Sequence, residues 1–311
     1  MKKKIAMLKR WMMILSRKTS VALKQGVGKA YCKDSIAGYY NDLTGKICET
    51  TQLDEEGIPI TIIAGNEIVY FPIAIFQYGL GCYDKYLLTK DEKYKEMFIA
   101  TVLWAKKKLK DDGSWDCFSA LKSELYNVSS MCQAEGASLL YRAFVETRDE
   151  ELRCMANKAI DFMLKPFTDG GTSFYEDDFL FFEEYPQEKR RTVLNGWIFS
   201  IFGLLDASIM NKGVYDELLE KAVDTLEQNL CRYDLEYWSK YDLDGNIASP
   251  AYNDLHACQL LVLSDIFAND TFLLYANKFM SYQDNKKYKN KAIFLKMLQK
   301  LFTSSDIVVI K

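Results

Sequence analysis

Histidine, proline and paired cysteines are scarce in this sequence of 311 residues. It contains one histidine, five prolines and eight cysteines, and no two cysteines form a Cys-x-x-Cys pair. Zinc sites are built from several histidines or from closely paired cysteines, so this pattern excludes the common zinc arrangements. Dispersed cysteines in apolar stretches are typical of reduced, buried side chains, which favours a reducing, cytoplasmic location.

Long hydrophobic runs and the motifs of common nucleotide enzymes are absent as well. No stretch approaches about eighteen uninterrupted apolar residues, so we expect no membrane-spanning helix. There is no P-loop, Rossmann fingerprint or Gly-x-Ser-x-Gly motif, which argues against nucleotide enzymes and common hydrolases. The formal net charge is −3 and the acidic excess lies in the body of the chain, which argues against nucleic acid as a partner.

Acidic residues are missing from the start of the chain. The first acidic residue is Asp34, and ten lysines and arginines precede it. Residues 1–34 therefore form a basic arm, for which two interpretations remain open. It is either an amphipathic helix that rests on the anionic inner face of a membrane or a solvated terminus. In the first case, each cation would contribute about 1 kcal/mol to membrane binding. Its apolar runs are too short for a signal peptide.

The body of the chain, residues 35–311, is expected to be one domain built from a helical repeat. After short strands or irregular structure up to about residue 70, four segments of about 60 residues share one plan. Each has an apolar helix, a polar turn, an amphipathic helix and a loop rich in aromatic residues, Gly and Asp. The apolar helices are expected to begin near Pro72, Met131, Val193 and Asp254.

The two kinds of helix predict an inner and an outer layer. Helices that are apolar all round are buried on both sides, whereas amphipathic helices cover them. This pattern predicts a mainly α protein: an α/α toroid, or incomplete barrel, of four helical hairpins with minor β-hairpins. The loops that follow the outer helices, 111–118, 169–186 and 232–246, should line its mouth. Asp-Gly turns in two of these loops resemble parts of calcium sites but lack the full ligand spacing, so calcium stays an alternative and no other cofactor is expected.

The most unusual loop segment is Phe-Phe-Glu-Glu-Tyr-Pro, which contains Glu183, Glu184 and Tyr185 and is followed by three cations at 189–191. Two neighbouring carboxylates can serve as acid and base on a glycan, or they can simply favour the positive end of the next helix. A second concentration of aromatic residues lies in 232–252. Its members either stack on sugars, take part in proton transfer or pack the core: Tyr233, Tyr237, Trp238, Tyr241 and Tyr252.

Several segments together resemble the C-terminal catalytic region of the D-glucuronyl C5-epimerases, which act on heparan-type and related uronic-acid glycans. The resemblance runs from about residue 36 to residue 285. The segments that carry it are YYNDLTGKI (39–47), YFPIAIFQYGLGCYDKY (70–86), CQAEGASLLYRAF (132–144), EEYPQEKRRTVLNGWIFSIFGLLD (183–206) and YDLDGNIASPAYNDLHACQL (241–260). Animal members have a further β region upstream, so we expect a minimal bacterial form.

The resemblance implies inversion of C5 in D-glucuronate residues of a polysaccharide or lipid-linked glycan. It implies Glu184 and Tyr252 as opposed acid–base groups, assisted by Tyr185 and Tyr241. Arg142, Arg190 and Arg191 are candidates to neutralise the substrate carboxylate. Further candidates for substrate contact are Gln133, Asn195, Trp238 and His256, although a lone histidine between apolar residues, such as His256, is more often a core residue.

The resemblance also has a departure and leaves alternatives open. The family's Tyr-Asp-Leu-Arg-His appears here as Tyr241-Asp-Leu-Asp-Gly245, so the basic residue and the histidine that animal members have near this tyrosine are missing. A polysaccharide lyase would share the same carbanion chemistry, and a noncatalytic glycan-binding protein could keep the same cleft. A homodimer that completes the cleft is also open.

Overall fold

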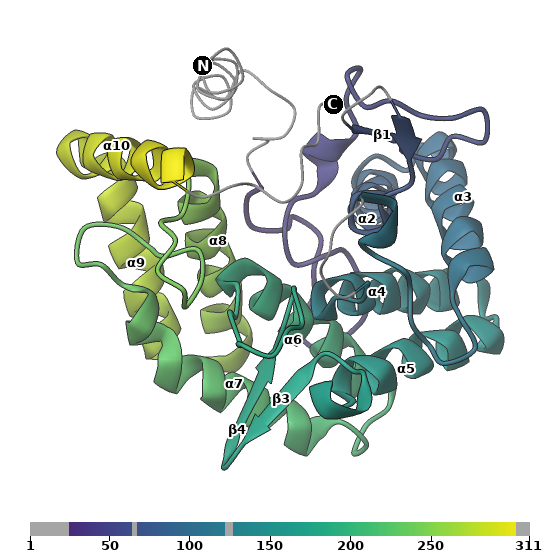
Figure 1. Ribbon diagram of the computed structural model, residues 1–311. Coiled ribbons are helices and arrows are strands. Elements are labelled where there is room, and N and C mark those ends of the chain that lie inside the picture. The colour runs from purple at the N-terminus through teal and green to yellow at the C-terminus, as the bar shows by residue number, and fades with distance from the viewer. Residues whose placement is uncertain (1–24, 64–66, 122–126, 303–311) are drawn as a thin grey trace.

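Four pairs of helices follow one another along the chain in the computed structural model, which describes residues 25–63, 67–121 and 127–302. Figure 1 shows the pairs arranged around a ring, with the first helix of each pair inside and the second outside. The inner helices are α2 (Pro72–Thr89), α4 (Ser130–Thr147), α6 (Leu194–Met210) and α8 (Pro250–Phe267). The outer helices are α3 (Glu92–Lys108), α5 (Glu150–Leu164), α7 (Asp216–Asn229) and α9 (Asp270–Asp284).

Burial separates the two layers as the patterns predict. Every residue of α6 from Leu194 to Ala207 is buried, whereas α7 buries only the face that carries Leu219, Val223 and Leu226. The inner helices pack closely: a Cβ at Gly203 of α6 would lie 2.6 Å from the Cα of Ala134 on α4. These observations confirm the predicted α/α toroid of four helical hairpins.

The predicted start of the fourth inner helix near Asp254 is wrong by about one turn, because α8 begins at Pro250. The Ser249 side chain accepts a hydrogen bond from the Tyr252 amide, and Pro250 occupies the first helical position. Both are strong helix-start signals, and they lie between the predicted loop 232–246 and the predicted helix start. As a result, Tyr252 lies on the first turn of an inner helix.

Short strands and 3-10 turns occupy the connections. The hairpin β3–β4 leads directly into the Glu183–Tyr185 segment, and the Leu180 amide of β4 donates to Thr225 Oγ1 of α7 at 2.9 Å. The strands are β1 (Thr61–Ile63), β2 (Glu67–Val69), β3 (Ser173–Glu176) and β4 (Phe179–Phe182), and both hairpins are antiparallel. The 3-10 turns are η2 (Thr44–Lys46), η3 (Ser119–Leu121), η4 (Phe167–Asp169) and η5 (Leu230–Tyr233).

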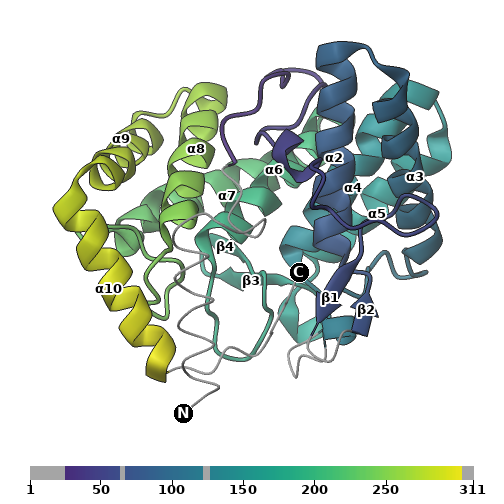
Figure 2. The same cartoon turned by 90° about the horizontal axis from the view of Figure 1, so that it is seen from above.

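The segment 26–43 passes between α8 and α2 on one side of the ring (Figure 2). Tyr31 Oη donates to Asp265 of α8 at 2.8 Å, and the Tyr39 amide donates to Asp84 of α2 at 2.8 Å. Residues 25–34, which the sequence assigns to the basic arm, therefore pack against the ring. The amphipathic helix considered for this arm lies mainly in residues 1–24, outside the described residues.

A further helix, α10 (Lys286–Phe302), follows the fourth pair and was not anticipated from the sequence. Gln299 attaches it to the loop before α8: its Nε2 donates to Gly245 O and its Oε1 accepts from the Ile247 amide, both at 3.0 Å. None of the helices in the described ranges is long and apolar enough to cross a membrane.

Candidate active site

The segment that precedes α6 and the loop that precedes α8 are far apart in the sequence but hydrogen-bond to each other. Val193 and Asp242 form an antiparallel bridge, the Leu194 amide donates to Tyr241 O at 3.0 Å, and the Leu243 amide donates to Arg191 O at 2.9 Å. This pairing holds the Glu184 segment, in the loop that ends the second repeat, beside the Tyr241 loop that ends the third.

Glu184 is buried against the first turn of α6. Only 6% of its surface is exposed, and its Oε2 has no hydrogen-bond partner. Burial raises the pKa of Glu184 to about 7, while interaction with the Tyr185 hydroxyl and the charge of Arg191 act in the opposite direction. An acid with such a pKa can both accept and release a proton near neutral pH.

Three tyrosines share the surroundings of Glu184. The rings of Tyr241 and Tyr252 lie edge to face with their centroids 4.9 Å apart, and Tyr185 stacks on Phe118 at 5.2 Å. Tyr252 is the most accessible of the three, with 40% of its surface exposed. Loss of hydration and then the charge of Glu184 raise the pKa of Tyr252 to about 12.

The same two causes raise the pKa values of Tyr185 and Tyr241 well above their usual range. All three phenols are therefore protonated near neutral pH and can serve as proton donors. The structure thus brings together the four residues that the resemblance implies for acid–base work: Glu184, Tyr185, Tyr241 and Tyr252.

Glu183 has a different environment from Glu184, although both are buried. Its carboxylate accepts hydrogen bonds from the Thr192 amide at 2.8 Å and from the Thr192 hydroxyl. Thr192 has a φ of 38°, which is unfavourable for a β-branched residue. Glu183 therefore holds the backbone turn that precedes α6, whereas Glu184 Oε2 has no hydrogen-bond partner.

Among the candidate cations, only Arg191 faces the tyrosines. Its Nε donates to Asp242 at 2.7 Å, and its guanidinium lies 5.7 Å from the Tyr185 ring centroid. The Arg190 guanidinium instead stacks on Phe181 at 3.5 Å and donates to Glu176 at 3.0 Å, so it holds the β3–β4 hairpin.

Arg142 lies apart from this group, near the C-terminal end of α4. It is 1% exposed, and its Nη1 donates to Asp206 Oδ2 at 2.6 Å. Its Nη2 donates to Gly38 O at 3.1 Å. The candidate role of Arg142 in binding the substrate carboxylate therefore has no support in its position, because a buried aspartate already neutralises it.

Two of the other candidates, Gln133 and Trp238, hydrogen-bond to the backbone of loops. The Gln133 side chain donates to Gly113 O at 2.6 Å and accepts from the Trp115 amide at 3.0 Å. Trp238 is fully buried and donates to Ala248 O at 2.9 Å. Neither group is positioned to contact a substrate.

Asn195 lies on the first turn of α6 and His256 on the second turn of α8, and both are buried. Asn195 Oδ1 and His256 Nε2 have no hydrogen-bond partner, while His256 Nδ1 lies 3.1 Å from Ser239 Oγ. Burial lowers the pKa of His256 to about 3, so the imidazole is neutral and does not carry charge near neutral pH.

Two buried ionisable side chains near these groups escaped the sequence analysis. Glu135 of α4 is fully buried, and only its Oε1 has a partner, Gln77 Nε2 at 2.9 Å. An acidic residue inside an otherwise apolar inner helix was the signal for it. Lys296 of α10 lies over the Tyr241 ring, with Nζ 5.6 Å from the centroid. No sequence pattern indicated which face of that helix would meet Tyr241.

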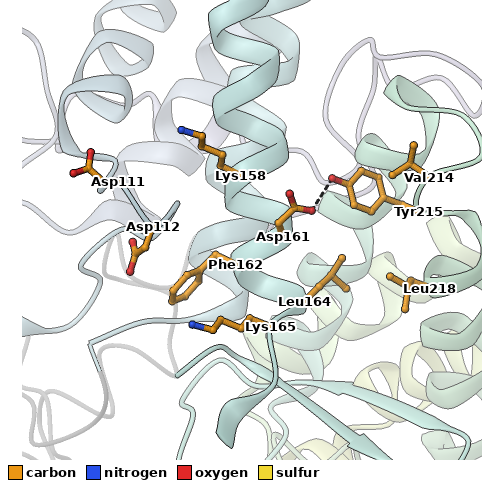
Figure 3. Close-up of a pocket in the computed structure, with 10 residues that line it drawn as sticks. All are labelled: Asp111, Asp112, Lys158, Asp161, Phe162, Leu164, Lys165, Val214, Tyr215 and Leu218. Carbon is orange, nitrogen blue, oxygen red and sulfur yellow. Dashed lines mark hydrogen bonds between the residues drawn. The ribbon is translucent and has the colours of Figure 1, made fainter. Parts of the chain in front are cut away.

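A separate pocket of about 550 Å³ lies between the loop after α3 and the helices α5 and α7 (Figure 3). Tyr215 donates to Asp161 at 2.9 Å on one side of it. None of the sequence-predicted site residues lines this pocket. Its lining residues are Asp111, Asp112, Lys158, Asp161, Phe162, Leu164, Lys165, Val214, Tyr215 and Leu218.

Gly196 is the position at which the backbone of α6 makes room for Glu184. A Cβ there would lie 2.6 Å from Glu184 Oε2 and 2.9 Å from Glu184 Cβ. We expect Gly196→Ala to displace the carboxylate, to cost about 1–3 kcal/mol of stability and to lower any reaction rate about tenfold or more. Gly45→Ala is the matched control, because a Cβ there meets nothing within 4 Å. If Gly196→Ala and Gly45→Ala have the same stability and reaction rate, Gly196 is not needed to position Glu184.

Comparison with known proteins identifies the family of this chain. The family described as D-glucuronyl C5-epimerase C-terminus matches residues 110–281. The D-glucuronyl C5-epimerase of Caenorhabditis elegans is 27% identical over 226 residues, which cover 64% of this chain and 37% of that protein. An uncharacterized protein of Methanocaldococcus jannaschii is 31% identical over 166 residues, or 50% of this chain and 53% of that protein. The chain thus spans about half or less of these relatives' length.

Among solved structures, the unsaturated glucuronyl hydrolase of Bacillus sp. GL1 has a TM-score of 0.50 at 16% identity, over 69% of this chain and 62% of that one. At such low identity this likeness shows the shared helical fold alone. The family match is more specific, because it covers more than half of the chain and includes Glu184, Tyr185, Tyr241 and Tyr252. The chain therefore belongs to the D-glucuronyl C5-epimerase C-terminal domain family.

Proposed function

We propose that this protein is an epimerase that converts D-glucuronate residues of a glycan to L-iduronate by inverting C5. The observation that carries the proposal is a buried carboxylate with a pKa of about 7 grouped with the Tyr241–Tyr252 pair. Membership of the family supports the reaction type, and the many tyrosines of the site suit a sugar polymer as substrate.

The chemistry explains why such a group is needed. The C5 proton of a uronate is weakly acidic, because its removal adds negative charge beside a carboxylate. A site for this reaction must reduce the charge of the carboxylate and supply one proton-transfer group on each face of the sugar. A carboxylate with a pKa near 7 and a phenol with a pKa near 12 meet this requirement for a base and an acid.

In the proposed mechanism, the ionised Glu184 takes the C5 proton, and the electron pair of the C–H bond moves into the substrate carboxylate. Tyr252 then donates its phenolic proton to the opposite face of C5. Glu184 is left protonated and Tyr252 is left as the phenolate. Exchange with solvent, assisted by Tyr185 and Tyr241, restores both groups, and Arg191 reduces the negative charge at the site.

Incubation with heparosan in deuterated water tests the proposal. We expect deuterium at C5 of the uronate and a mixture of the two epimers, measured by NMR. The rate should rise as the pH is raised through about 7, because Glu184 must be ionised to act as a base. Absence of exchange on heparosan and on other glucuronate polymers would contradict the proposal. Growth of ultraviolet absorbance from an unsaturated product would identify a lyase instead, and binding without exchange a noncatalytic glycan-binding protein.

A further inference from the structure

Lys296 is the charged residue of α10 that is turned into the protein. Only 7% of its surface is exposed, although the helix also carries exposed lysines such as Lys287. Gln299 follows three residues later, on the same face of the helix, and bonds to Gly245 O and to the Ile247 amide. The orientation of Lys296 is therefore determined by the attachment of α10 to the loop that carries Tyr241.

The buried ammonium is not neutralised by its neighbours. Among the described residues, no carboxylate lies within ion-pair distance of Lys296 Nζ, which instead lies over the Tyr241 ring. The nearby Asp242 already accepts from Arg191 Nε at 2.7 Å, from Asn246 Nδ2 at 2.8 Å and from the Asn246 amide at 3.0 Å.

Retaining a buried, unpaired lysine is costly, because an ammonium loses its hydration there without a compensating charge. Burial, and then the charges of Lys300 and Arg191, lower the pKa of Lys296 to about 8, while Asp242 has the opposite effect. A buried methionine or leucine would fill the same space without this cost. The unbalanced charge beside the tyrosines indicates a negatively charged partner.

We propose that Lys296 binds the carboxylate of the uronate whose C5 is inverted. This inference rests on the proposed function and names the cation that recognises its substrate. Arg191 shares its charge with Asp242, whereas Lys296 supplies a positive charge beside Tyr241 that no described carboxylate pairs. The ammonium favours a carboxylate in the ground state and more strongly the charge that accumulates on it when the C5 proton leaves.

This contribution comes from outside the region that identifies the family. The family match ends at residue 281, whereas α10 spans Lys286–Phe302. Helix α10 is attached at Gly245, in the segment where the sequence has Asp244-Gly245 in place of the base and histidine of the resemblance. Substrate recognition beside Tyr241 is thus assigned to a helix that lies beyond the matched region and not to the loop itself.

The test compares Lys296→Met with Lys296→Arg and with Lys287→Met, an exposed lysine of the same helix, as matched control. Two ligands are used: a heparosan oligosaccharide and its carboxyl-reduced counterpart, in which glucose replaces glucuronate. Binding is measured by calorimetry, and C5 exchange gives kcat and KM. For the wild type we expect tighter binding of the heparosan oligosaccharide, which weakens as the pH rises through about 8 because Lys296 loses its proton.

In Lys296→Met we expect about a tenfold or greater loss of affinity for the heparosan oligosaccharide and no change in affinity for the carboxyl-reduced one. The fall in kcat/KM should exceed the loss of affinity, because the ammonium interacts more strongly with the charge that develops during the reaction. Thermal stability should be unchanged or higher, because an apolar side chain replaces a buried charge. Lys296→Arg should keep part of the preference and extend it to higher pH, and Lys287→Met should behave as wild type.

The outcomes separate the two proposals. If the wild type exchanges C5 deuterium and the folded Lys296→Met variant still prefers the carboxylate ligand, only the role of Lys296 is overturned. If Lys296→Met unfolds at a lower temperature with its ligand preference intact, Lys296 is a structural anchor and the proposal also fails. If the wild type neither binds nor exchanges the heparosan oligosaccharide, the proposed function fails together with this inference.

Discussion

Replacement of Glu184 by glutamine is expected to reduce C5 deuterium exchange by about 10²–10⁴-fold while the fold is retained. The amide keeps the shape of the side chain between Tyr185 and Gly196 but cannot accept the C5 proton. The measurement is deuterium incorporation into heparosan, with Glu188→Gln as an exposed control in the same loop. Exchange within about twofold of wild type in Glu184→Gln would contradict the assignment of Glu184 as the base.

The same variant has a stability signature. In the folded protein the pKa of Glu184 is about 7, above the value of 4.5 for an unperturbed glutamate. The folded chain therefore binds this proton more tightly than the unfolded chain, and the wild type loses stability as the pH rises from about 4.5 to about 7. Glu184→Gln has no such proton, so its stability relative to wild type should increase over this pH range, as measured by urea unfolding.

Replacement of Arg142 by methionine is expected to cost about 3–5 kcal/mol of unfolding free energy, because it leaves Asp206 buried without its countercharge. Arg142 Nη1 lies 2.6 Å from Asp206 Oδ2, and Tyr40 Oη donates to Asp206 Oδ1 at 2.7 Å. Urea unfolding measures the loss. The double variant Arg142→Met with Asp206→Leu should recover most of it, since no isolated charge then remains.

This change should leave the exchange rate per folded molecule unchanged, measured at a temperature where the variant is folded. The expectation follows from the position of Arg142, whose two terminal guanidinium nitrogens are engaged by Asp206 and Gly38. A loss of exchange with unaltered unfolding would show instead that Arg142 binds substrate, as considered from the sequence.

Features that repeat along the chain could be predicted, and features that depend on one distant partner could not. The four inner helices were recognisable because apolar residues surround each of them, and three of their starts were located within one residue. The fourth start was misplaced because Ser249 and Pro250 lie in a loop-like sequence. The grouping of Glu184 with the tyrosines followed from the family resemblance, and the Val193–Asp242 bridge provides its physical basis.

The cations show the limit of sequence reasoning most clearly. An arginine can be chosen as a candidate for substrate binding from the sequence, but whether its guanidinium is free depends on its partner in the fold. Asp206 lies 64 residues from Arg142, and no sequence pattern in either segment indicates that the two form an ion pair. Lys296 was overlooked because α10 itself was not anticipated, and because the face that it turns inward depends on Gln299, which bonds to Ile247, 52 residues away.

The segment 26–43 has a consequence for how the ring forms. Its Tyr31 is bonded to Asp265, a residue 234 positions later in the chain. During synthesis this segment emerges before the helices of the ring, whereas its partner on the last inner helix emerges after all the other inner helices. Closure of so long a loop carries a large entropic cost, so the repeats are expected to assemble in order before this contact forms. We therefore expect the contact between segment 26–43 and the fourth repeat to form late, in the final cooperative step of folding.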